Sequence, residues 1–240
     1  MRYDKLDILR WIAISMMIVF HINYSLLNIF SISFFNFSEI FWYIFWLIWW
    51  LLFIIISALS FLLSEKKNWD KVFKKYLKYS IFLWIIALTI TLFTYFFIRE
   101  QRIVFWILHF FSLSFLLITF FRKFKYLNII IWTIIISIPL LTPLESNTNY
   151  FSFIWLHNKS FYSADFWPLI PYFWIFLLSY TISLYLYEKE ILQKILSWEK
   201  KWYVYTFLKF LWKHSLIIYL VHVPIIVSLI YLLEKIWHIL

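Results

Sequence analysis

The stretch EIFWYIFWLIWWLLFIIISALSFLLS, residues 39–64, decides the fold of this chain. After Glu39 it contains no charged residue until Glu65, and as an α-helix it is long enough to cross the core of a bilayer, which takes about 20 residues. Comparable apolar runs recur from one end of the chain to the other. We therefore predict an all-α fold, a polytopic membrane helix bundle, because a lone apolar segment satisfies its own backbone in lipid only as a helix.

The composition also indicates that the chain folds in lipid. Of the 240 residues, 65% are hydrophobic and 14% are charged, whereas a soluble domain is about half apolar and about a quarter charged. No polar stretch is long enough for a separate soluble domain, so we expect one transmembrane domain over residues 1–240. The first apolar run continues past His21 and Asn23 without a small-residue cleavage site, which argues against a removable signal peptide. The lack of cysteine excludes disulfides, thiol nucleophiles and Cys-ligated metals.

The basic residues predict how the chain crosses the membrane. We expect seven spans, near residues 8–30, 39–64, 79–98, 103–121, 127–142, 168–187 and 214–233. If the amino terminus is cytoplasmic, the inner segments hold all but four of the 22 basic residues, namely Arg99, Arg102, Lys159 and Lys235. The positive-inside rule thus predicts an odd number of spans, a cytoplasmic amino terminus and a long outer loop at 143–167. Because this distribution accounts for the net charge of +10, no nucleic acid is expected as a partner.

Ionisable residues inside predicted spans are candidates for function, because lipid does not solvate them. Arg10 and His21 are 11 residues apart, which places them about 20° apart on one helix face and about 16 Å apart along its axis. Asp7 precedes Arg10 by one turn, a spacing that allows an i,i+3 ion pair. Arg10 has a simpler interpretation as a marker of the cytoplasmic boundary.

Two further histidines, His109 and His222, occur in predicted spans. From the expected topology, His109 lies about 9 Å below the outer surface and His21 about 18 Å above the inner one, so the two could meet at one depth. Ser215 and Tyr219 share a helix face with His222. A single buried histidine is usually a packing residue, but three at compatible depths predict a shared polar cavity. No helix has the His/Glu spacing of a helical metal site, and we expect no metal.

Four blocks of sequence carry a family resemblance: LDILRWIAISMMIVFH (6–21), FWILHFFSLSFLL (105–117), SADFWPLIPYFWIFLLSY (163–180) and LWKHSLIIYLVHVPII (211–226). In this order they resemble the catalytic domain of the heparan-alpha-glucosaminide N-acetyltransferase family, within the wider set of transmembrane acyltransferases. The resemblance covers nearly the whole chain. It implies transfer of an acetyl group from cytoplasmic acetyl-CoA, as co-substrate, to a sugar or similar acceptor at the far side of the membrane, here expected to be the cell membrane.

The resemblance also carries functional positions onto Arg10, His21, His109, Asp165 and His222. Arg10 is then expected to bind CoA phosphates, because a guanidinium offers paired donors to phosphate oxygens. His21 is expected either to take a proton from the attacking acceptor or to be acetylated itself. His109, His222 and Asp165 are expected to orient the base, stabilise the oxyanion or hold the acceptor, and the residue patterns do not rank these roles.

Two other functions fit the same polar residues. A transporter or flippase for a lipid-linked or acyl intermediate would use an intramembrane polar cavity for passage. An assembly partner would use the polar residues only to fasten helices together.

The chain contains no glycine and 16 tryptophans, although about 17 glycines are expected at ordinary usage. The family pattern has glycine where this chain has Trp11, Trp106, Trp174 and Trp212. Glycine lets membrane helices approach closely, and the largest side chain at such positions should obstruct packing. Our hypothesis is that these four residues are UGA codons that the source organism reads as glycine. The alternative is an aromatic-rich composition with true tryptophans at membrane interfaces.

Overall fold

The computed structural model describes residues 3–35, 37–141, 146–197 and 214–237. Most of these residues are helical, which confirms the predicted all-α fold. The chain divides into two compact units, residues 1–56 with 191–240 (unit 1) and residues 57–190 (unit 2).

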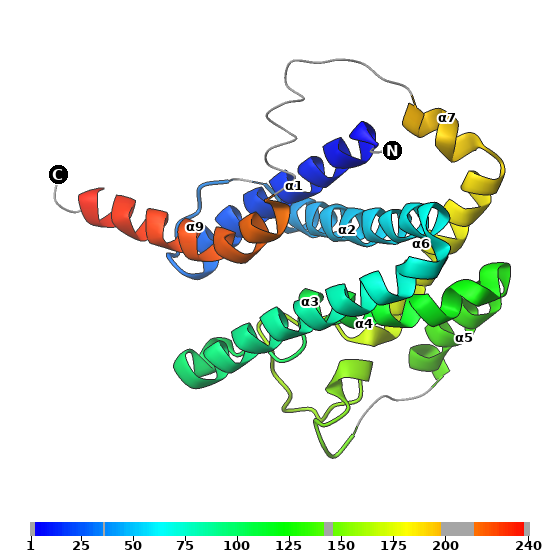
Figure 1. Cartoon of the computed structure of the whole chain (residues 1–240). Coiled ribbons are helices and arrows are strands. Elements are labelled where there is room, and N and C mark those ends of the chain that lie inside the picture. The colour runs from blue at the N-terminus through cyan, green and yellow to red at the C-terminus, as the bar shows by residue number, and fades with distance from the viewer. Residues whose placement is uncertain (1–2, 36, 142–145, 198–213, 238–240) are drawn as a thin grey trace. The chain divides into compact units, whose positions relative to one another are not determined.

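Unit 1 is built around the first helix, α1 (Asp4–Asn28). It also contains the first part of α2 (Glu39–Lys67), the short α7 (Ile191–Ser197) and α9 (Ser215–Trp237). The buried side chains of α1 include Ala13, Ile14 and Met17, which share one helix face. Helix α1 packs against both α7 and α9, so the first and the last described helices of the chain are in contact (Figure 1).

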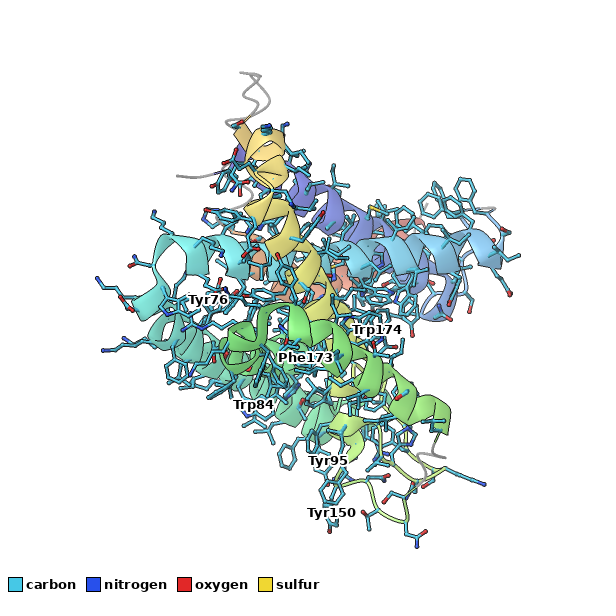
Figure 2. All side chains as sticks on the ribbon, turned by 90° about the vertical axis from the view of Figure 1, so that its right-hand side faces the viewer. Tyr76, Trp84, Tyr95, Tyr150, Phe173 and Trp174 are labelled. Atoms are coloured by element: carbon cyan, nitrogen blue, oxygen red, sulfur yellow. The ribbon has the colours of Figure 1, made fainter. Side chains whose placement is uncertain are left out.

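Unit 2 contains the last part of α2, from Ser57 to Lys67, and four further helices. Helix α3 (Trp69–Phe97) packs along α4 (Ile107–Phe121), α5 (Asn128–Leu141) packs along α6 (Leu169–Glu188), and α4 also contacts α6. Three short 3-10 helices connect these elements: η1 (Arg99–Gln101), η2 (Arg122–Leu127) and η3 (Ser152–Ile154). Figure 2 shows Tyr76, Trp84 and Tyr95 in succession along α3, with Tyr150 of the predicted outer loop beyond Tyr95 at the same end.

Six of the described helical segments are long and apolar enough to cross a bilayer, one fewer than the seven predicted. The difference lies in residues 107–138, which count as one segment although η2 interrupts it, with Lys125 in a left-handed conformation at φ 46°. The resulting α4 and α5 have 15 and 14 residues. At 1.5 Å per residue each covers about 22 Å, which is shorter than a bilayer core of about 30 Å.

Two predicted helix starts were also wrong. Helix α3 begins at Trp69 rather than near residue 79. Its first turns are amphipathic, with Val72 and Tyr76 buried, so they contain no continuous apolar run of the kind that predicts a span. Helix α4 begins at Ile107 rather than 103, because residues 102–105 are non-helical and form hydrogen bonds with residues 163–167.

Candidate active site

His21 of α1 and His222 of α9 lie side by side in unit 1. Their ring centroids are 4.7 Å apart and their planes are nearly perpendicular, at 87°. His222 is buried, with 8% of its surface exposed, and His21 is partly buried. The structure therefore brings together two of the histidines that the sequence singled out, from opposite ends of the chain.

Backbone hydrogen bonds define which nitrogen of each ring carries the proton. His21 Nδ1 is 2.8 Å from the carbonyl oxygen of Met17, and His222 Nδ1 is 2.6 Å from that of Tyr219. A carbonyl oxygen only accepts hydrogen bonds, so both Nδ1 atoms donate and, in the neutral ring, each Nε2 keeps its lone pair. The Nε2 atom of His222 is buried and has no hydrogen-bond partner among the described residues. Each ring thus keeps a basic nitrogen, Nε2, that takes no part in the backbone hydrogen bond of that ring.

Aromatic side chains surround the histidine pair. The indole ring of Trp49 on α2 lies 6.0 Å from the His21 ring, and the Tyr219 ring lies 5.7 Å from that of His222. Phe20 packs on both His21 and Trp49. Such neighbours exclude water, and electrostatic interactions with a reacting group are stronger in a dry environment.

Arg10 lies on the same continuous helix as His21. Its Nη1 atom is 2.9 Å from Oδ1 of Asp7, which confirms the predicted i,i+3 ion pair. The Asp7 side chain is buried, whereas 21% of the Arg10 side chain is exposed. The buried carboxylate thus holds a guanidinium that remains partly accessible at the amino-terminal end of α1, about 16 Å along the axis from His21.

His109 belongs to unit 2, in the first turn of α4, and only 3% of its surface is exposed. Its ring stacks on Phe105 with centroids 5.2 Å apart and meets the edge of Trp84 at 4.9 Å. Its Nδ1 atom is buried without a hydrogen-bond partner among the described residues. An unsatisfied buried nitrogen costs free energy, which is a common feature of residues retained for function.

Asp165 lies in the segment that leads into α6, also in unit 2. The indole N–H of Trp167 donates to its Oδ1 at 2.5 Å. Burial raises the pKa of the Asp165 carboxyl to about 6, against the opposing effects of hydrogen bonds from Trp167 and from the backbone of Phe166. The carboxyl is therefore not simply solvated, although Asp165 belongs to the predicted outer loop 143–167.

The hydrogen-bonded pairing of residues 102–105 with residues 163–167 connects Asp165 to His109. The Ala164 amide donates to the Arg102 carbonyl at 2.9 Å, and the Trp167 amide donates to the Phe105 carbonyl at 2.7 Å. Phe105 is the residue on which His109 stacks. A single chain of contacts thus runs from the Asp165 carboxyl through Trp167 and Phe105 to the His109 ring.

A buried polar pair that the sequence did not single out lies elsewhere in unit 2. The Tyr180 hydroxyl donates to Glu65 Oε2 at 2.9 Å, and both residues are almost fully buried. In the sequence, Glu65 only marks the end of the apolar run, although a carboxylate directly after such a run is a signal that could have been read. Across the described residues, no group of three or more His, Cys, Asp or Glu side chains is arranged to hold a metal ion.

These helices, with buried ionisable groups placed between them, define a polytopic integral membrane protein. The model of the family "Heparan-alpha-glucosaminide N-acetyltransferase, catalytic" matches residues 2–224, and the chain belongs to this family. Membership of this family implies that the protein is an enzyme of the membrane acetyltransferase type. Comparisons with curated proteins and with solved structures found no match. All five candidate residues, Arg10, His21, His109, Asp165 and His222, fall within the matched range.

Two of the four motif tryptophans have described neighbours. Trp106 is buried at the amino-terminal end of α4, where its indole N–H donates to the Ala87 carbonyl at 3.4 Å. The Trp174 ring lies 5.9 Å from that of Trp132 on α5. Trp11 is partly buried on α1, and Trp212 lies outside the described residues.

Proposed function

We propose that this protein transfers an acetyl group from cytoplasmic acetyl-CoA to a sugar or related acceptor at the opposite face of the cell membrane. The observation that carries the proposal is the His21–His222 pair, in which the Nδ1 hydrogen bonds leave both Nε2 lone pairs free. Membership of an acetyltransferase family supports acetyl transfer as the reaction in which these bases act.

In the direct mechanism, Nε2 of His21 accepts the proton of an acceptor hydroxyl or amine as its oxygen or nitrogen attacks the thioester carbonyl. The carbonyl becomes a tetrahedral oxyanion, the carbon–sulfur bond breaks, and the departing thiolate takes a proton to leave as CoA-SH. In the two-step alternative, Nε2 of His21 itself attacks the thioester, releases CoA and then passes the acetyl group to the acceptor. Both routes need the lone pair that the Met17 hydrogen bond leaves on Nε2.

The other candidates have supporting roles in this proposal. His222, against the His21 ring, shares the proton that His21 takes up, because its own Nε2 is free to accept one. Arg10, partly exposed and held by Asp7, binds CoA phosphates. His109 and Asp165 orient or hold the acceptor or stabilise the oxyanion, and their shared connection through Phe105 suggests that they act as one group.

The test is turnover by the purified full chain in lipid nanodiscs. Release of CoA thiol would be measured with acetyl-CoA and a panel of amino sugars and hydroxyl-bearing sugars. We expect CoA release that depends on the acceptor and falls at least about 100-fold in His21→Ala, the usual loss for a general base or nucleophile. His214→Ala, a histidine change just before α9, is the matched control and should retain activity.

Full transfer by His21→Ala would contradict the assigned mechanism. The transporter or flippase alternative predicts a different result: passage of substrate across proteoliposomes without consumption of acetyl-CoA. That outcome would replace the proposed function, since an acetyltransferase must consume the donor in proportion to product.

A further inference from the structure

We propose that unit 2 carries a binding site for anionic phospholipid headgroups, formed by the first turns of α3 together with η2. Four lysines on α3 form what we call the lysine stripe: Lys71, Lys74, Lys75 and Lys78. Their i, i+3, i+4, i+7 spacing places them along one face of the helix, and all four are exposed. The site shares no residue with the candidate acetyl-transfer set and does not depend on the proposed function.

The rest of the same segment holds the stripe in place. Val72, Tyr76 and Ser80 are buried, so these turns are attached to unit 2 with the lysines outward. Lys75 donates to the Ser64 hydroxyl at 2.6 Å and lies 5.1 Å above the Tyr76 ring. In the stretch from Trp69 to Ser80 the only acidic residue is Asp70, so the positive charge of the lysines is largely uncompensated along the sequence.

Arg122 joins η2 to the beginning of α3. Its guanidinium carbon lies 4.0 Å from the centroid of the Trp69 ring, and its Nη1 donates to the Trp69 carbonyl at 3.3 Å. The rings of Phe73 and Phe120 are 5.9 Å apart across the same junction. These contacts attach η2 to the first turns of α3. Two further exposed lysines, Lys123 and Lys125, belong to η2, and Lys66 and Lys67 immediately precede α3 at the end of α2.

Exposed aromatic side chains alternate with these lysines along the sequence of α3 and η2, as they do in segments that lie at the level of lipid headgroups. Trp69, Phe73, Tyr79 and Phe124 are each between 39% and 49% exposed. Large aromatic residues at such positions typically sit at the level of the headgroups, with their rings toward the acyl chains. A ligand that matches both features has a negative phosphate and apolar chains, as anionic phospholipids do.

The experiment measures lipid selectivity of the full chain in mixed bilayers, using spin-labelled phosphatidylglycerol and spin-labelled phosphatidylcholine as probes. The stripe variant is Lys71→Gln, Lys74→Gln and Lys78→Gln together, which leaves the Lys75–Ser64 contact intact. The control variant, Arg99→Gln, Lys159→Gln and Lys235→Gln, removes the same charge from exposed positions elsewhere. Thermal unfolding in pure phosphatidylcholine establishes that both variants are folded.

We expect wild type to select phosphatidylglycerol, with an association ratio that falls at least about fivefold in the stripe variant and in high salt, but not in the control. Equal selectivity in wild type and the stripe variant would overturn the proposal, as would an equal loss in the control. Loss of CoA binding in the stripe variant, without any lipid selectivity in wild type, would assign the lysines to the nucleotide and also overturn it.

Discussion

The rings of His21 and His222 lie 4.7 Å apart at right angles, with each Nδ1 committed to a backbone carbonyl. A pair of this kind can hold one extra proton between two bases, because a protonated ring donates where a neutral ring accepts. We therefore expect the two residues to act as a unit rather than independently.

Replacing His222 tests that coupling. In the proposed acetyl transfer, His222→Ala should lower kcat at least about tenfold and leave the KM for acetyl-CoA largely unchanged, because the donor's phosphates are assigned to Arg10. The double variant with His21→Ala should be little worse than His21→Ala alone, since groups that act together are not additive. Steady-state kinetics of the three variants in nanodiscs measure this. Strict additivity of the two effects would contradict a shared role.

Arg10 should show the opposite kinetic pattern. If Arg10 binds CoA phosphates as proposed, Arg10→Ala is expected to raise the KM for acetyl-CoA at least about tenfold with a smaller effect on kcat, because the phosphates lose their donors while the reacting carbonyl is not touched. Lys5→Ala, a cation change near the same end of α1, is the comparison. An unchanged KM in Arg10→Ala would favour the interpretation of Arg10 as a boundary marker.

Asp165 should make stability depend on pH in an unusual direction. Burial raises the pKa of this carboxyl in the folded protein to about 6 from an ordinary value of 3.8, so the folded state binds the proton more tightly than the unfolded state. Its ionised form therefore destabilises the fold above pH 6, and this penalty disappears as the pH falls toward 4.

Asp165→Asn keeps an oxygen that can accept from Trp167 and removes the ionisation. The unfolding free energy of wild type minus that of Asp165→Asn should therefore rise by about 1–3 kcal/mol between pH 7 and pH 4. Denaturation in detergent at several pH values measures the difference. A difference that stays constant across this range would show that Asp165 ionises as an ordinary surface carboxyl does.

The Glu65–Tyr180 hydrogen bond should stabilise unit 2. Tyr180→Phe removes the donor and leaves a buried carboxylate without it, with an expected cost of about 1–3 kcal/mol. Tyr185→Phe, at an exposed position of the same helix, should change stability by less than about 0.5 kcal/mol. A double-mutant cycle with Glu65→Gln gives the coupling energy, and a value near zero would mean that the contact contributes nothing.

The backbone conformation of Trp155 indicates that the glycine hypothesis also applies to this residue, which lies outside the motif blocks. Trp155 has φ 80° and ψ −9°, a left-handed conformation that favours glycine and that an aromatic residue rarely adopts. In addition, the indole N–H groups of Trp42, Trp49 and Trp132 are buried without an acceptor among the described residues, whereas buried tryptophans usually find one. We expect Trp155 to be encoded by UGA and to be glycine in the protein from its own cell.

Two measurements check this expectation. Gene sequencing identifies the codons, and mass spectrometry of peptides from the native protein identifies the residues. UGG codons at Trp11, Trp106, Trp174 and Trp212 would rule out the hypothesis for the motif positions, and a tryptophan-containing peptide spanning residue 155 would rule it out there.

Local patterns in the sequence were sufficient for the features that one helix determines alone. The helical fold follows from apolar runs, because lipid leaves the backbone no other partner, and the Asp7–Arg10 ion pair follows from a spacing of one turn. The family follows from four blocks in order. The break at η2 and the early start of α3 were missed, since both depend on which side chains find a buried neighbour.

What only the tertiary structure decided is which polar groups meet. The sequence identified His21, His109 and His222 one by one and expected all three to share a cavity, which stays a prediction for His109. The packing of α1 on α9 decided that His21 faces His222, and the pairing of residues 102–105 with 163–167 linked Asp165 to His109. Periodicity specifies the face and depth of a residue within its own helix, but its partner depends on contacts between segments far apart in the chain, which no local pattern encodes.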